Sequence, residues 1–329
     1  MSADAMHRVI DELADLGTKR IRFTGGGEPF VHPQMIEFIE HVKERGLIAA
    51  VTTNFSALTS DKVARMAAAG VDEVTASVWA GTPDMYARSH PKKSQKTFEK
   101  IESLLKELCA QKKPHAKVIV ANVLFSMNYM ETREMLDFAL RCGADGVYYT
   151  VVDSVAKSTD GLLLTPPHLS TIRDHLAQVR RRVDEVNMTR AAPFALDNFD
   201  GLLRRLEAVG APTGDYDRLA VDSIPCYVGW IFCRITPDGD VAACCRGVEK
   251  PLGNLHKASF TEIWNGPTYR EFRRMALGEK KTHPYFAPFN CHRACDNLMH
   301  NEAQHERIMA LDAQEKEHLV QYVVNGAPR

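Results

Sequence analysis

The strongest constraint on the fold is an alternation of helical and strand patterns between residue 6 and about residue 155. Apolar residues recur at helical spacing and stop at a glycine, and a short β-branched or apolar run follows. Strands are expected near residues 21–24, 48–53, 74–79, 118–125 and 147–152. Because a helix separates each strand from the next, the strands are expected to lie parallel. The pattern therefore predicts the α/β class, with a parallel sheet covered by helices.

This alternation ends after residue 155, and three further parts of the chain follow. Residues 156–221 are expected to form a helical connecting region, in which Thr165-Pro166-Pro167 begins a helix. Residues 222–300 are rich in Cys, Pro and Gly and are expected to form a small separate domain. Residues 301–329, with Leu319 and Val323 on an apolar face, are expected to form a closing helix.

Composition excludes several classes of function. The formal net charge is -1, which gives no reason to expect nucleic acid as a partner. No apolar run approaches the roughly 20 residues of a membrane-spanning helix, and the first residues have no signal-peptide core, so a cytoplasmic protein is expected. Eight cysteines in such a protein favour metal binding over disulfides, because the cytosol keeps thiols reduced. Six of them lie between residues 226 and 295, so the metal chemistry is expected there.

The segment Gly25-Gly26-Gly27-Glu28-Pro29 directly follows the first expected strand. Glycines allow a ligand to approach the backbone closely, and Glu28 places a carboxylate beside them. A positively charged amine would suit this position. The alternative is a flexible turn with a solvated Glu28.

The order of strand, GGEP, a helix opening with Pro33, and a strand ending in Thr52-Thr53-Asn54 resembles radical S-adenosylmethionine enzymes. The resemblance covers residues 6 to about 155 and implies a partial (β/α)6-type parallel barrel over residues 1–155. It also implies that Gly26, Gly27 and Glu28 bind the amino group of the methionyl part of S-adenosylmethionine.

The same resemblance implies further cofactor contacts. Ser77 and Arg88 fall where the family contacts the ribose and the carboxylate of the cofactor, and Asn54 and Asn128 are further candidates of this type. A strand-end cap is the alternative for Ser77. A solvated helix charge is the alternative for Arg88.

The radical chemistry of the family depends on a CxxxCxxC loop that holds a 4Fe-4S cluster, and this chain contains no such triad. The nearest sequence, Cys291-His292-Arg293-Ala294-Cys295, has Leu298 where a third cysteine would be required. In related sequences the loop and the first strand of the barrel precede the helix that begins here at residue 6. We therefore expect a truncated form that lacks both, and a naturally degenerate relative is the alternative. Catalytic residues are not identified.

Four cysteines in the C-terminal part are expected to bind metal: Cys226, Cys244, Cys291 and Cys295. The turn signal Asp238-Gly239 predicts a β-hairpin that brings the first two together. Four thiolates can hold a 4Fe-4S cluster or a structural zinc ion. Cys233 and Cys245 are expected to be buried thiols, and His292 is kept as a reserve ligand.

The spacing from Cys226 through Gly239 to Cys244, followed by Gly253-Asn254 and Glu262-Ile263-Trp264, resembles the auxiliary-cluster extension called the SPASM or Twitch domain. The resemblance covers residues 226–296 and favours iron over zinc. The full two-cluster pattern needs more cysteines than this chain has, so one auxiliary 4Fe-4S cluster is expected.

Together the resemblances imply a radical SAM oxidoreductase-type enzyme that cleaves S-adenosylmethionine reductively and removes a hydrogen atom from an organic substrate. The expected substrate is a small carbohydrate-like metabolite or a peptide, and the expected electron donor is a flavodoxin- or ferredoxin-type protein. A second 4Fe-4S cluster, which generates the radical, is expected only in a form with its N-terminus restored. The alternative is a non-catalytic iron-sulfur protein that binds the cofactor or transfers electrons.

Overall fold

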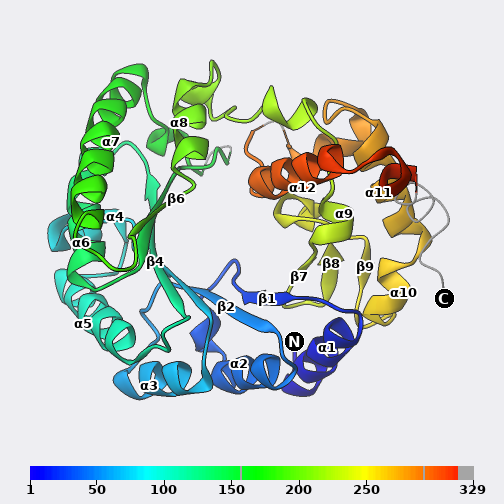
Figure 1. The fold of residues 1–329 in the computed structure, drawn as a ribbon, viewed down its shortest axis with the longest axis horizontal. Helices are drawn as coiled ribbons and strands as arrows, with labels where there is room; N and C mark the ends of the chain where they lie inside the picture. The colour runs from blue at the N-terminus through cyan, green and yellow to red at the C-terminus, as the bar shows by residue number, and fades with distance from the viewer. Residues whose placement is uncertain (156–157, 292, 318–329) are drawn as a thin grey trace. The chain divides into compact units, whose positions relative to one another are not determined.

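The computed structural model describes residues 1–155, 158–291 and 293–317, and the chain divides into two compact units (Figure 1). The first unit is Met1–Tyr216 and the second is Asp217–Arg329. Leu319 and Val323, which the sequence pattern assigns to a closing helix, lie outside the described residues.

Six parallel strands form the sheet of the first unit, and their spatial order equals their order in the chain. The strands are β1 Arg20–Phe23, β2 Ile48–Thr53, β3 Glu73–Ser77, β4 Lys117–Leu124, β5 Gly146–Val151 and β6 Ala195–Asp197. The expected parallel sheet is confirmed. The sequence pattern missed β6, which lies within the expected connecting region and adds a sixth strand next to β5.

Helices lie along the outer side of this curved sheet (Figure 1). They are α1 Ala3–Asp15, α2 Met35–Glu44, α3 Ser60–Ala69, α4 Pro83–Ser89, α5 Gln95–Gln111, α6 Thr132–Arg141, α7 Pro166–Asn187 and α8 Phe199–Glu207. Short 3-10 helices occur at η1 Pro29–Val31, η2 Asp160–Leu162 and η3 Ala211–Thr213. Among the described residues, no helix has both the length and the apolar character that crossing a bilayer requires.

The two faces of the sheet differ in character. Alternate residues such as Val74, Val120 and Val147 are fully buried, which is the pattern of a sheet face covered by helices. On the opposite face, Ser77 of β3 and Tyr148 of β5 are half-buried and lie in one row of the strand register. The face that points away from the helices is therefore the more polar one.

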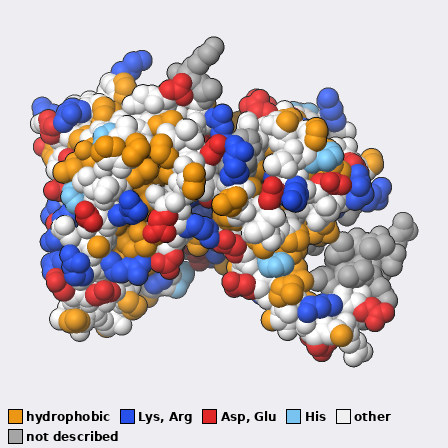
Figure 2. All heavy atoms as spheres, turned by 90° about the horizontal axis from the view of Figure 1, so that it is seen from above, with side chains coloured by type: hydrophobic (Ala, Val, Ile, Leu, Met, Phe, Trp, Pro, Cys, Tyr) orange, Lys and Arg blue, Asp and Glu red, His pale blue; other side chains and the backbone are white. Residues whose placement is uncertain are grey.

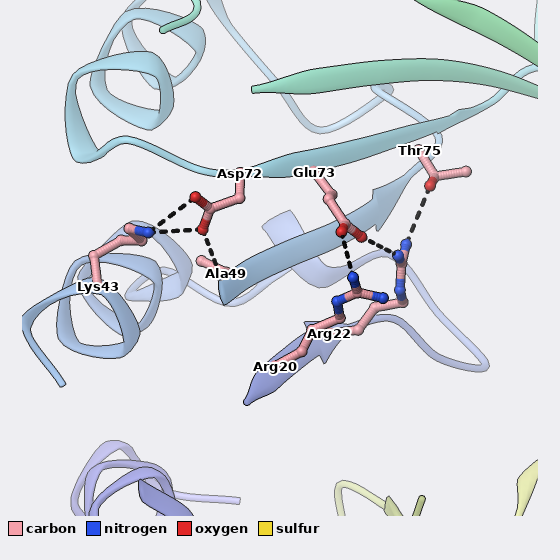
Figure 3. A network of polar contacts seen from close by, with 7 residues as sticks. All are labelled: Arg20, Arg22, Lys43, Ala49, Asp72, Glu73 and Thr75. Carbon is pink, nitrogen blue, oxygen red and sulfur yellow. Dashed lines mark hydrogen bonds and ion pairs between the residues drawn. The ribbon is translucent and has the colours of Figure 1, made fainter. Parts of the chain in front are cut away.

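Asp72 fixes the amino ends of β2 and β3 (Figure 3). Its carboxylate accepts hydrogen bonds from Nζ of Lys43 on α2, at 2.8 and 3.0 Å, and from the backbone N–H of Ala49, at 2.8 Å. The N–H of Asp72 donates to the carbonyl of Ala49 at 2.9 Å. One carboxylate thus connects the end of a helix with the start of two strands.

Asp145 repeats this arrangement between β4 and β5. Its carboxylate accepts from the N–H of Val118 at 2.7 Å and from Nζ of Lys112 at 3.2 Å, and its own N–H donates to the carbonyl of Val118 at 2.8 Å. Gly70 and Gly143, two residues before each aspartate, have positive φ angles of 77° and 76°. The same Gly-x-Asp element therefore sets the strand register twice.

Two arginines connect the edge strand β1 to β3 (Figure 3). Arg20 and Arg22 form ion pairs with Glu73 at 2.8 and 2.6 Å, and Arg22 also donates to Oγ1 of Thr75 at 3.2 Å. Charged side chains on an edge strand disfavour pairing with a foreign strand. On the face that Figure 2 draws, basic and acidic side chains are interspersed, as the near-neutral composition leads one to expect.

The second unit has a small antiparallel sheet of β7 Arg234–Ile235, β8 Asp240–Ala242 and β9 Gly253–Asn254, in that order. The hairpin expected at Asp238-Gly239 is confirmed, and Gly239 has the positive φ of 81° that this turn requires. The helices are α9 Val228–Ile231, α10 Phe260–Trp264, α11 Pro267–Gly278 and α12 Leu298–Ala310, with 3-10 helices η4 Ala220–Asp222, η5 Cys245–Glu249 and η6 Pro284–Phe289. Buried aromatic residues, including Tyr269, Phe272, Phe286 and Phe289, form its core.

Replacing Asp145 with Ala should lower the free energy of unfolding by about 2 to 3 kcal/mol, because the N–H of Val118 loses its acceptor and Lys112 loses its ionic partner. Urea denaturation measures the change. Asp137→Ala is the control, since its carboxylate is 39% exposed and pairs with Arg133 on the same helix. That pair should contribute about 0.5 kcal/mol or less. Equal losses in the two variants would contradict the role assigned to Asp145.

Candidate functional site

Glu28 links the carboxyl ends of β1 and β2. Its Oε1 accepts hydrogen bonds from Oγ1 of Thr53 at 2.7 Å and from the N–H of Phe30 at 3.2 Å. Its Oε2 accepts from the N–H of Asn54 at 2.7 Å. The residue is half-buried and holds the glycine segment against the end of β2, so it is not a freely solvated turn residue.

The surroundings of Glu28 fit one further hydrogen-bond donor. A carboxylate offers about four lone-pair positions, and the chain uses three of them here. Gly26 and Gly27 are exposed, and their backbone groups make no hydrogen bond with the part of the chain that the structure describes. A carboxylate with one vacant position beside open backbone groups suits the ammonium group of an amino acid.

The structure brings Asn54 and Ser77 to the same edge of the sheet as Glu28. Both are half-buried and lie at the carboxyl ends of neighbouring parallel strands, β2 and β3. Oδ1 of Asn54 accepts from the N–H of Ser56 at 2.9 Å, which fixes the turn after β2. Ser77 is the last residue of β3 and pairs with Ala121 of β4.

Arg88 makes an ion pair within its own helix. It is on α4, its side chain is 61% exposed, and its guanidinium lies 3.7 Å from the carboxylate of Asp84, one turn earlier. This is the arrangement of a solvated helix charge. A role in binding would require the side chain to leave this position.

Asn128 does not lie where a ligand can reach it. It is fully buried, its Oδ1 accepts from the N–H of Phe125 at 2.8 Å, and its Nδ2 donates to the carbonyls of Trp79 and Val123, both at 2.9 Å. The cofactor contact expected for Asn128 is therefore corrected. Its amide joins the loops that follow β3 and β4.

Glu131 also connects the loops that follow β3 and β4, and the sequence pattern did not predict this role. Its carboxylate accepts from the N–H of Gly81 at 2.9 Å and from Oγ1 of Thr82 at 2.7 Å. Trp79, in the same loop, is 37% exposed and has a φ of 63°, which is uncommon for a residue other than glycine. No local pattern reveals these contacts, because the partners are about 50 residues apart.

In the second unit, one cavity is lined by all four cysteines expected to bind metal: Cys226, Cys244, Cys291 and Cys295. They come from three segments of the chain, namely the turn before α9, the end of β8 and the turn before α12. The N–H of Cys226 donates to the carbonyl of Ala276 at 3.0 Å, and the N–H of Cys295 donates to the buried carboxylate of Asp217 at 2.7 Å.

Burial raises the pKa of each of these four thiols, to about 12 for Cys291. Repulsion between neighbouring thiolates raises the pKa of Cys244, Cys291 and Cys295 further. Several buried thiolates need a cation to stabilise them, and a coordinated metal ion deprotonates its thiol. The donor set therefore suits a metal centre.

Four thiols around one cavity can hold an iron-sulfur cluster or a single zinc ion. Within the described ranges, no three His, Cys, Asp or Glu side chains converge closely enough to hold one metal ion. Zinc requires four sulfur atoms about 2.3 Å from a common centre, whereas a 4Fe-4S cluster takes its four thiolates around a larger body. Here the thiols surround a cavity.

The remaining cysteines of this unit differ in position. Cys245 also lines the cavity, and the charge of Arg234 partly offsets the rise that burial causes in its pKa. Cys233 is absent from the cavity lining, and burial raises its pKa to about 12. His292, the reserve ligand, lies outside the described residues.

Comparison with known proteins gives a match to each unit. Residues 1–139 match the model of the Radical SAM superfamily, and residues 226–296 match that of SPASM, an iron-sulfur cluster-binding domain.

Two curated relatives are similar over most of the chain. A tungsten-containing aldehyde ferredoxin oxidoreductase cofactor-modifying protein from Pyrococcus furiosus is 26% identical over 90% of this chain and 81% of its own length. An AdoMet-dependent heme synthase from Methanosarcina barkeri is 23% identical over 83% of this chain and 76% of its own length.

The fold is similar to the crystal structure of Streptococcus suis SuiB bound to S-adenosylmethionine. The TM-score is 0.61 and the sequence identity is 17%, over 83% of this chain and 61% of the SuiB chain. This chain thus spans less than two thirds of SuiB, which has also been solved bound to the precursor peptide SuiA.

In a form with its N-terminus restored, replacing Glu28 with Gln should weaken S-adenosylmethionine binding by about ten- to a hundred-fold, because a charge-assisted hydrogen bond to the ammonium is lost. The free energy of unfolding should also fall by about 1.5 to 3 kcal/mol, since an amide cannot accept all three hydrogen bonds that the carboxylate accepts. Calorimetry measures the affinity, and urea denaturation measures the stability.

Glu131→Gln is the matched control for this prediction. It removes an equivalent carboxylate from the neighbouring loop joint, so it should lower the stability by a similar amount and leave the affinity unchanged. Equal affinities in the native protein and Glu28→Gln would show that Glu28 serves the fold alone.

Replacing Cys226 and Cys244 together with Ala should abolish iron binding after anaerobic reconstitution with iron and sulfide, because half of the ligand set is lost. Iron analysis and visible absorbance measure the outcome. Cys109→Ala, on α5 of the other unit, is the control and should retain the iron. A colourless protein with stoichiometric zinc, or equal iron loss in the control, would contradict the assignment.

Proposed function

Because this chain belongs to the radical SAM superfamily and carries a SPASM domain, we propose that it is a radical SAM oxidoreductase-type enzyme with one auxiliary 4Fe-4S cluster. S-adenosylmethionine and 4Fe-4S clusters are the cofactors that these two domains imply. The observation that carries the proposal is the gathering of Cys226, Cys244, Cys291 and Cys295 around one cavity.

The carboxyl edge of the parallel sheet is the proposed cofactor site. Glu28 would accept the ammonium group at its vacant lone-pair position, with Gly26 and Gly27 allowing close approach. Asn54 and Ser77 would contact the cofactor from the next two strand ends. Bound S-adenosylmethionine supplies, on reduction, a 5′-deoxyadenosyl radical that can remove a hydrogen atom from an organic substrate.

The four cysteines of the cavity would hold a redox centre that can take up the single electron left on the substrate after hydrogen removal. The net reaction would then be an oxidation of the substrate by two electrons, one leaving with the hydrogen atom and one passing to this centre. Holding the substrate itself is the other role that such a centre can have. A flavodoxin- or ferredoxin-type protein is the proposed source of the electron that cleaves the cofactor.

Two substrate classes, a peptide and a small carbohydrate-like metabolite, are proposed for this reaction. The names of the relatives point to different molecules: the cofactor of an aldehyde ferredoxin oxidoreductase, heme, and the precursor peptide bound by SuiB. Both kinds of substrate are compatible with the more polar face of the sheet, which points away from the helices. The proposed fold of the first unit is a partial (β/α)6-type parallel barrel that lacks its first strand.

A second candidate is a non-catalytic iron-sulfur protein, and the observation that favours it is the absence of CxxxCxxC from all 329 residues. The gene sequence upstream of Met1 distinguishes the two. An in-frame CxxxCxxC would support the enzyme, and an in-frame stop codon close to the start would support the non-catalytic protein.

The chain as printed, reconstituted with iron and sulfide, should bind about one 4Fe-4S cluster and form no 5′-deoxyadenosine from S-adenosylmethionine and dithionite. The reason is that radical formation needs three cysteines at CxxxCxxC spacing, which none of the eight provides. Liquid chromatography detects the product. Turnover by this chain would show that another set of residues holds the radical-generating cluster.

A further inference from the structure

Lys281 is a buried cation on the wall of the cysteine cavity. Only 6% of the residue is exposed, and it lines the same cavity as the four cysteines. Its Nζ donates to the carbonyls of Ala276 at 3.1 Å and Glu279 at 3.0 Å and lies 4.8 Å from the ring centre of Phe286. These contacts fix the position of the ammonium group.

The charge of Lys281 has no carboxylate partner within the described part of the chain. Two of the three N–H donors of its ammonium group are bonded to carbonyls. The carboxylate of Asp222 accepts a hydrogen bond from the backbone N–H of Lys281 at 2.6 Å. Buried lysines are rare without a paired anion, because removing an ammonium group from water is costly. The cavity should therefore receive an anionic group.

The four thiols are positioned to provide that anion once they hold a cluster. They line the same cavity as Lys281. Two other charged residues line the cavity, the half-buried Arg246 and the exposed Asp296, and they have opposite signs. Lys281 is thus the most deeply buried charge of the cavity wall.

We propose that Lys281 is the counter-ion of the auxiliary cluster and raises its reduction potential. A 4Fe-4S cluster with four thiolates is anionic and gains one more negative charge when it takes up one electron. A fixed positive charge in a poorly screened interior stabilises the reduced state more than the oxidised state. This inference rests on the proposed function, because it requires the cluster to be present.

The test compares variants of the full chain that bear the reconstituted cluster. Lys281→Gln keeps an N–H donor and removes the charge, whereas Lys281→Arg keeps the charge. Lys250→Gln is the matched control: Nζ of Lys250 bonds to the carbonyl of Tyr285 at 3.4 Å and lies over the ring of that residue, and Lys250 is absent from the cavity lining. Potentiometric titration followed by electron paramagnetic resonance gives each midpoint potential.

At a fixed applied potential, Lys281→Gln should lower the ratio of reduced to oxidised cluster about ten-fold or more, which corresponds to about 59 mV for one electron. Lys281→Arg and Lys250→Gln should change that ratio much less. An unchanged potential in Lys281→Gln with a full cluster would overturn the counter-ion role and leave the proposed function intact.

Cluster loss is also informative. If Lys281→Gln loses the cluster and Lys281→Arg retains it, while both apoproteins melt like the native apoprotein, the need for a counter-ion is supported. If both variants lose the cluster, or if the Lys281→Gln apoprotein does not fold, Lys281 acts through packing and the inference fails. If the native protein binds no iron, the proposed function fails and this inference fails with it.

Discussion

Carboxylates that accept backbone N–H groups from a neighbouring strand hold the parallel sheet in register at both of its ends. Asp72 and Asp145 do so at the amino ends, and Glu28 does so at the carboxyl end, where it receives the N–H of Asn54. A slip of one residue would turn every side chain of a strand to the opposite face. These bonds therefore decide that Ser77 and its row face away from the helices.

Much of the architecture follows from local sequence patterns. The first five strands each have an apolar or β-branched run, and a glycine ends the helix before several of them. The sequence pattern therefore indicates where these helices end and the strands begin. The strand β6 is three residues long, with Leu196 between Ala195 and Asp197, and nothing in such a short run distinguishes a strand from a loop. The hairpin of the second unit was predictable because Asp-Gly specifies its turn.

Some residues of the candidate sites could likewise be predicted from the sequence, and others could not. The four cavity cysteines could be identified from their spacing in the sequence. The hairpin itself pairs Arg234 with Ala242, and Cys226 lies before it, in the turn that precedes α9. The burial of Asn128 could not be predicted, since one of its two acceptors, the carbonyl of Trp79, lies 49 residues away in the loop after β3. Lys281 was equally hidden: it stands in the run Glu279-Lys280-Lys281, which resembles a solvated surface segment, and only tertiary packing buries it.

The ligands of the cavity come from three separated segments, and this separation has a mechanical consequence. A cluster held by Cys226 and Cys295 would close a loop of about 70 residues and act as a covalent cross-link within the second unit. Binding of the inorganic group then contributes directly to the folding equilibrium of that unit. Oxidative destruction of the cluster would release all three segments at once. The second unit would then unfold more easily and become more susceptible to proteolysis.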